Sequence, residues 1–262
     1  MRPVIRKYGP DPAQFGELWL PDATAGSSAT AGGSATAGTV VVVHGGFWRA
    51  RYGASLGWPL AADLVRRGYA VWNLEYRRVG LGGGWPATFA DVAAGMDLLA
   101  DLPVDSSRVV AIGHSAGGQL ATWAAGRAKL PATAAGAGPR VELTAVVSLA
   151  GALWLADCAR DGVGGTAALD LMGGGPDDLP ARYRLADPSA AVPLRVPVVC
   201  VHARADDEVP FDQSARYVEA ATSAGAPASL LEAAGDHYTL VDPSAPDWSL
   251  VVDTLPGLLG TG

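Results

Sequence analysis

A serine flanked by glycines is the residue whose surroundings most favour covalent chemistry. Ser115 lies within the run Gly-His-Ser-Ala-Gly at residues 113–117, after the apolar residues 109–112 and before a helix-forming segment. A sharp turn from strand to helix exposes a serine hydroxyl on a strained backbone, and glycine two residues before and after it leaves the room required. We therefore predict that Ser115 is a nucleophile, the alternative being an ordinary turn serine.

A glycine pair follows an earlier apolar run. Residues 39–43 read as a buried strand, and His-Gly-Gly-Phe-Trp follows at residues 44–48. Such a loop can aim backbone N–H groups at the carbonyl oxygen of a substrate, so we predict an oxyanion hole made by Gly46, Phe47 and Ala116. The alternative is a tight turn with no binding role. We expect His44 to brace the loop by donating to a neighbouring carbonyl.

A carboxylate and a histidine follow Ser115 along the chain. Residues 197–202 form a third apolar run, and Asp206 and Asp207 lie just beyond it. A carboxylate at the end of a parallel strand lies on the same sheet edge as the serine, where it can orient a histidine. Asp206 is preferred because it comes first after the strand. His237 is the histidine that follows, and we predict that it is the general base.

Together these motifs resemble the α/β-hydrolase superfamily over nearly the whole chain, and the order Ser115, Asp206, His237 is the one that this superfamily uses. The His-Gly-Gly-x-Trp form at residues 44–48 is similar to the kynurenine formamidase and small carboxylesterase branch. The resemblance implies hydrolysis of esters or of activated amides through an acyl-enzyme, with N-formylkynurenine as an alternative substrate. The aromatic residues at the end of the glycine loop predict a small pocket that favours short-chain aryl esters. The pair Gly118 and Gln119 departs from the formamidase pattern. The Gly-Gly pair that follows the serine motif is general among esterases.

Several large aromatic side chains are candidates for the substrate pocket, although most large aromatics in proteins belong to the core. The candidates are Trp48, Trp58, Trp85, Trp154 and Tyr238. Two other functions fit the same motifs: an acyltransferase that passes the acyl group to an alcohol, and a non-catalytic binding module. The second would usually have lost a member of the triad, and this chain has kept all three.

Composition is typical of a globular enzyme. The net charge of −7 disfavours nucleic acid and anionic membrane surfaces as partners, and 49% hydrophobic residues can build a large core. The N-terminus has no hydrophobic signal region, and no apolar run approaches a membrane span, so we expect a cytoplasmic protein. Cys158 and Cys200 are expected to be free thiols. The four histidines lack ligand-like spacing, so neither a metal nor an organic cofactor is expected.

Alternating strand and helix patterns predict one α/β-hydrolase domain over residues 1–262, with a mostly parallel sheet of about eight strands and helices on both faces. An N-terminal antiparallel hairpin is expected before the parallel strands. Residues 22–38 are low in complexity and are predicted to be a mobile loop. Residues 151–192, rich in glycine and irregular, are predicted to be a short lid-like insertion. The oligomeric state is left open.

Overall fold

The computed structural model describes residues 2–21 and 36–260 of the chain. Within them, eight strands form one sheet in the order β1-β2-β4-β3-β5-β6-β7-β8. The pairs β1–β2 and β2–β4 are antiparallel, and the remaining pairs are parallel. This confirms the expected mostly parallel sheet and its N-terminal hairpin. The strands are β1 (Val4–Lys7), β2 (Phe15–Trp19), β3 (Thr39–Val43), β4 (Ala70–Leu74), β5 (Val109–His114), β6 (Ala145–Leu149), β7 (Val198–Ala203) and β8 (Ala228–Ala233).

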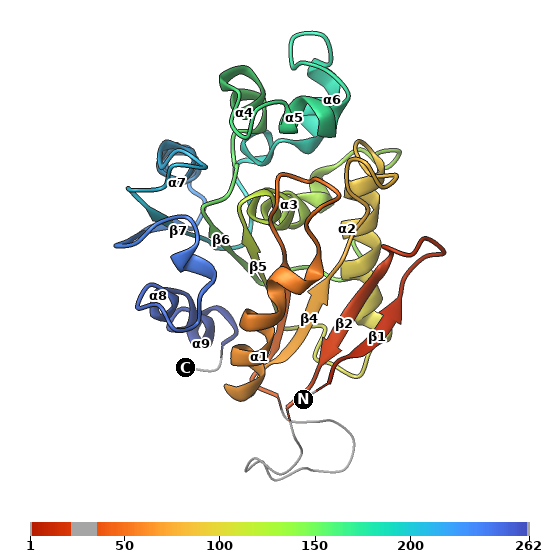
Figure 1. Cartoon of the computed structure of the whole chain (residues 1–262), viewed down its shortest axis with the longest axis vertical. Helices are drawn as coiled ribbons and strands as arrows, with labels where there is room; N and C mark the ends of the chain where they lie inside the picture. The colour runs from red at the N-terminus through yellow and green to blue at the C-terminus, as the bar shows by residue number, and fades with distance from the viewer. Residues whose placement is uncertain (1, 22–35, 261–262) are drawn as a thin grey trace.

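Helices cover both faces of the sheet (Figure 1). Side chains of α1, α8 and α9 join one apolar core layer, and those of α2, α3 and α7 join the other. The helices are α1 (Trp58–Arg66), α2 (Ala87–Asp97), α3 (Ala116–Ala125), α4 (Leu155–Asp161), α5 (Ala167–Met172), α6 (Pro180–Ala186), α7 (Asp212–Ser223), α8 (Trp248–Val252) and α9 (Leu255–Leu258).

The two core layers follow from the alternation of side chains along the central strands. In β3, Val41 and Val43 face the layer of α2 and α3, whereas Val40 and Val42 face the layer of α1. All four side chains are buried. A strand covered on both faces must be apolar at every position, which is why β3 reads as an unbroken run of β-branched residues.

The segment between β6 and β7 is more regular than its composition indicates. It contains α4, α5 and α6, which lie together at one end of the molecule in Figure 1. The expectation of an irregular segment was wrong, because two of its glycines end helices. Gly162 and Gly173 adopt left-handed φ angles of 69° and 75° at the C-caps of α4 and α5, where glycine is favoured. We call residues 151–192 the helical insert.

The predicted mobile loop at residues 22–38 falls largely on residues 22–35, which lie outside the described residues. In the described part of the chain, no helix combines the length and the apolar character needed to cross a membrane.

Candidate active site

Ser115 lies at the turn between β5 and α3 with φ 54° and ψ −119°. This left-handed backbone is rare for a residue with a side chain and is strained. The Ser115 N–H donates to the carbonyl of Leu149 at 2.8 Å, which ties the turn to the end of β6. A Cβ at Gly113 would lie 2.2 Å from the carbonyl oxygen of Gly117, and a Cβ at Gly117 would lie 2.1 Å from that of Val43. Both glycines are therefore required by space.

The structure brings His237 and Asp206 together. The His237 Nδ1–H donates to Asp206 Oδ2 at 2.7 Å, and the Asp206 side chain is fully buried. The N–H groups of Glu208 and Val209 donate to the other carboxylate oxygen at 2.9 and 2.8 Å. Asp207, by contrast, is exposed. Of the two neighbouring acids, Asp206 is thus the one placed to orient the imidazole.

Asp206 is ionised despite its burial. Burial alone would raise the pKa of Asp206, but the hydrogen bonds from His202, His237 and the Val209 N–H outweigh it and hold this pKa well below its usual range. The carboxylate can therefore fix the tautomer of His237 and stabilise an imidazolium.

Two further histidines, His202 and His114, lie beside this pair, and no sequence motif assigns either of them a role. His202 is buried at the end of β7, with Nε2 2.9 Å from the Val209 carbonyl and 3.3 Å from Asp206 Oδ2. His114 donates its Nε2–H to the carbonyl of His237 at 2.9 Å. Burial, aided by the nearby His237, lowers the pKa of His114 to about 3, so this ring stays neutral. The sequence did contain a signal for these two histidines. His114 and His202 both lie at the carboxyl end of a predicted strand, close to a predicted catalytic residue.

The loop after β3 has an unusual backbone. Gly46, Phe47 and Trp48 have consecutive positive φ angles of 109°, 55° and 55°. The N–H groups of Gly46, Phe47 and Ala116 donate to no acceptor among the described residues. The arrangement leaves these donors available to a bound oxygen atom, as an oxyanion hole requires.

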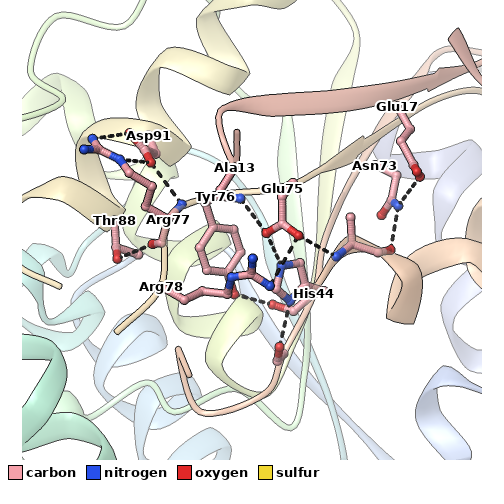
Figure 2. Close-up of polar contacts among 12 residues, drawn as sticks. Ala13, Glu17, His44, Asn73, Glu75, Tyr76, Arg77, Arg78, Thr88 and Asp91 are labelled. Atoms are coloured by element: carbon pink, nitrogen blue, oxygen red, sulfur yellow. Dashed lines mark hydrogen bonds and ion pairs between the residues drawn. The ribbon is translucent and has the colours of Figure 1, made fainter. Parts of the chain in front are cut away.

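A buried polar network lies behind this loop (Figure 2). His44 places Nδ1 2.8 Å from the Gly45 carbonyl, the neighbouring-carbonyl contact expected of it, and Nε2 3.1 Å from Glu75. Its ring stacks on Tyr76 with centroids 4.4 Å apart, and the Tyr76 hydroxyl donates to the His44 carbonyl. Arg78 completes the network with Nη1 3.3 Å from Glu75. Sequence reasoning missed Glu75, Tyr76 and Arg78.

Glu75 is the centre of that network. Burial would raise the pKa of Glu75, but the hydrogen bond with His44, the Ala54 N–H and the charge of Arg78 lower it overall. The carboxylate accepts the N–H groups of Ala54 and Tyr76 at 2.9 and 2.8 Å. It therefore joins β4 to the residues that follow the loop after β3.

We expect Glu75→Gln to lower the free energy of unfolding by about 3 to 5 kcal/mol, because it leaves the buried Arg78 without a counter-charge. Thermal unfolding would show this as a fall in Tm of roughly 10 °C. The control is Asp101→Asn, which breaks an exposed ion pair with Arg140 and should leave Tm nearly unchanged. Equal losses of stability in the two variants would contradict a structural role for Glu75.

Two cavities meet at Ser115. The larger has a volume of about 180 Å³ and is lined by Ser115, His237, Phe47 and Tyr238 together with aliphatic side chains. The smaller, of about 10 Å³, is lined by Ser115, Ala116, Phe47 and Trp48 among others. Of the predicted pocket residues, Tyr238 thus lines the larger cavity and Trp48 the smaller.

The other three aromatic candidates, Trp58, Trp85 and Trp154, line neither of these two cavities. Each of these tryptophan rings instead contacts a residue outside the two cavities, which the sequence alone does not reveal. Trp58 is half exposed and donates to Glu17 at 2.8 Å. Trp85 packs edge-on against Phe89. Trp154 lies beneath the guanidinium of Arg216.

In the described residues, no group of three or more His, Cys, Asp or Glu side chains is arranged to hold a metal ion. Cys158 and Cys200 are free and buried, and burial raises the pKa of each thiol to about 12. Neither thiol is therefore a ready nucleophile.

The BD-FAE family model matches residues 29–220, a range that holds Ser115 and Asp206 and ends before His237. No curated protein matches the chain. Among solved structures, the chain is similar to a truncated carbohydrate esterase from gut microbiota, with 21% identity over 99% of this chain and 96% of that one and a TM-score of 0.78.

Two further solved structures are similar to this chain. Esterase Est2 of the Planctomycetes species Thermogutta terrifontis, with butyrate bound, is 19% identical over 97% of this chain and 90% of that one, with a TM-score of 0.72. Esterase B of Lactobacillus rhamnosis is 22% identical over 98% of this chain and 85% of that one, with a TM-score of 0.77. At these identities the likeness shows a common fold.

Proposed function

The chain belongs to the BD-FAE family, and from this premise we propose that it is a serine esterase with Ser115 as nucleophile, His237 as base and Asp206 as the acid. The observation that carries the proposal is the 2.7 Å hydrogen bond between Asp206 and His237 at a cavity that both His237 and Ser115 line. A buried carboxylate, an imidazole and a serine on a strained turn are the parts that acyl transfer needs.

The mechanism follows from these positions. His237 takes the proton from Ser115 as the serine oxygen attacks the carbonyl carbon, and Asp206 stabilises the imidazolium. The N–H groups of Gly46, Phe47 and Ala116 bind the developing oxyanion, where each donor is worth about 3 to 4 kcal/mol. His237 then gives its proton to the leaving oxygen. Water attacks the acyl-enzyme with His237 as base and releases the acid.

We expect short-chain aryl esters to be the best substrates. Phe47 and Tyr238 provide aromatic walls, and neither cavity at Ser115 offers a long trough for an acyl chain. Values of kcat/KM for 4-nitrophenyl acetate, butyrate, octanoate and decanoate should fall steeply with chain length, because each methylene without a site forfeits binding energy. A preference for decanoate would contradict the proposal.

The formamidase function remains a second candidate, supported by the His-Gly-Gly-Phe-Trp run that forms the loop after β3. Hydrolysis of N-formylkynurenine, measured beside 4-nitrophenyl acetate, separates the two activities. Turnover of the ester alone leaves a carboxylesterase. Product analysis with added alcohols distinguishes both from an acyltransferase, which would form new esters.

A further inference from the structure

The proposed oxyanion hole is assembled from two separate segments of the chain. The N–H groups of Gly46 and Phe47 belong to the loop after β3, whereas the N–H group of Ala116 belongs to the first residue of α3. Such donors stabilise an oxyanion only when they all reach the same oxygen atom. A residue that fixes the distance between the two segments would therefore position the oxyanion hole without contacting the substrate.

The loop after β3 needs support from outside itself. Phe47 and Trp48 both have φ angles of 55°, in the left-handed region that residues with side chains rarely adopt. A backbone of this kind persists only where the surrounding contacts hold it. The Trp48 carbonyl accepts the Val79 N–H at 2.9 Å, and the Trp48 side chain is buried. The side chain of Trp48 is therefore a second point at which the loop can be held.

Gln119 provides that support from α3. The indole Nε1–H of Trp48 donates to Gln119 Oε1 at 3.1 Å, and Gln119 Nε2 donates to the carbonyl of Ala186 at 2.8 Å. Gln119 is fully buried and lies about one helical turn after Ala116. The bond between Trp48 and Gln119 therefore joins the loop after β3 to the helix that carries the third donor.

The chemistry of its partners allows the Gln119 amide one orientation. An indole N–H can only donate and a carbonyl oxygen can only accept, so the amide oxygen must face Trp48 and the amide nitrogen must face Ala186. A reversed amide would bring two donors together on one side and two acceptors on the other, in a buried site where such a mismatch is costly. Ala186 is the last residue of α6, so the helical insert fixes the amide that holds the loop.

Resting on the proposed function, we propose that Gln119 is a positioning residue for the oxyanion hole: its side-chain amide, held by the end of α6, sets the distance between the loop after β3 and the first turn of α3. Gln119 lines neither cavity at Ser115, so its effect passes through Trp48. The role differs from core packing, because an apolar side chain of the same length would fill the same space without holding the indole.

Gln119→Met tests this role, because methionine keeps the length of the side chain and removes both hydrogen bonds of the amide. We expect kcat for 4-nitrophenyl acetate to fall about 10- to 100-fold with KM changed less than about threefold, since a displaced donor weakens the transition state more than the bound ester. The loss should be equal for 4-nitrophenyl butyrate, because both esters present the same carbonyl oxygen. A loss that differs tenfold between the two esters would overturn the proposal, since it would reflect a change in the shape of a cavity.

Trp123→Phe is the matched control. Trp123 also lies on α3 and donates its indole N–H to the end of α6, at the Leu185 carbonyl 2.8 Å away. This bond joins α3 to the helical insert and leaves out the loop after β3. The variant should lower Tm, as Gln119→Met does, while kcat stays at the value of the natural protein. Equal kcat values in the Gln119→Met and Trp123→Phe variants would show that Gln119 has a structural role alone.

Trp48→Phe removes the donor of the same bond. A variant with both Trp48→Phe and Gln119→Met should lose about as much kcat as Gln119→Met does, because the two side chains act through one bond, whereas losses that multiply would contradict the proposal. The rate of fluorophosphonate labelling at Ser115 separates this inference from the proposed function. A natural protein that is not labelled fails as a serine esterase, and equal labelling rates in the natural protein and Gln119→Met reject the positioning role alone.

Discussion

Replacing Ser115 by alanine should abolish both labelling by a fluorophosphonate and hydrolysis of 4-nitrophenyl acetate, with a loss of kcat on the order of 10⁶. The loss is large because the covalent step has no substitute nucleophile at this site. The two cysteine thiols are buried with raised pKa values, and His237 cannot activate a methyl group.

Mass spectrometry of the labelled peptide identifies the modified residue. The control is Ser107→Ala, which removes an exposed hydroxyl bonded to Asp105 and should leave labelling and turnover unchanged. Labelling that survives in the Ser115→Ala variant would show that another residue is the nucleophile.

Asp206→Asn should lower kcat by on the order of 10⁴ with little change in KM. The N–H groups of Glu208 and Val209 donate to one side-chain oxygen of Asp206, so an asparagine would keep its carbonyl there. Its NH₂ would then face His237 at the position of Oδ2. A donor there forces Nδ1 to accept, which leaves the proton on Nε2, where the imidazole must be free to take the proton from Ser115.

The neighbouring acid provides the control, since Asp207→Asn makes the same chemical change one residue away on an exposed side chain. It should alter kcat less than threefold. The two variants are compared by steady-state kinetics, with circular dichroism to verify folding. A larger loss at Asp207 than at Asp206 would contradict the assignment of the acid.

The fold could be predicted because local signals agreed with it. The apolar runs of β3, β5 and β7 are buried on both faces, and glycines lie beside β3 and at the turn after β5. The elbow glycines could be predicted for a similar reason, because their need for space arises from backbone near in sequence or in the adjacent strand. Ser115, Asp206 and His237 could be proposed as a set from the sequence because each follows one of the predicted strands.

Contacts between distant side chains could not be predicted. Glu75 reads in the sequence as one acid in a polar run, and only the fold places it against His44 and the buried Arg78. The positions of Trp58, Trp85 and Trp154 away from both cavities depend on contacts of the same kind, because the apolar character of a ring does not determine which cavity it lines. In the helical insert, glycine content pointed to irregular structure, whereas Gly162 and Gly173 act as helix ends.

The helical insert packs closely against the loop after β3 at Gly164. A Cβ at Gly164, whose φ is 67°, would lie 2.2 Å from the ring of Phe47, and Arg49 donates to the Gly164 carbonyl at 3.2 Å. Gly162 and Gly165 on either side have no such close neighbour. For protein engineering this separates two kinds of position: at Gly162 and Gly165, whose φ angles are 69° and 73°, a side chain would meet backbone strain alone, while a side chain at Gly164 would also move a wall that both cavities share.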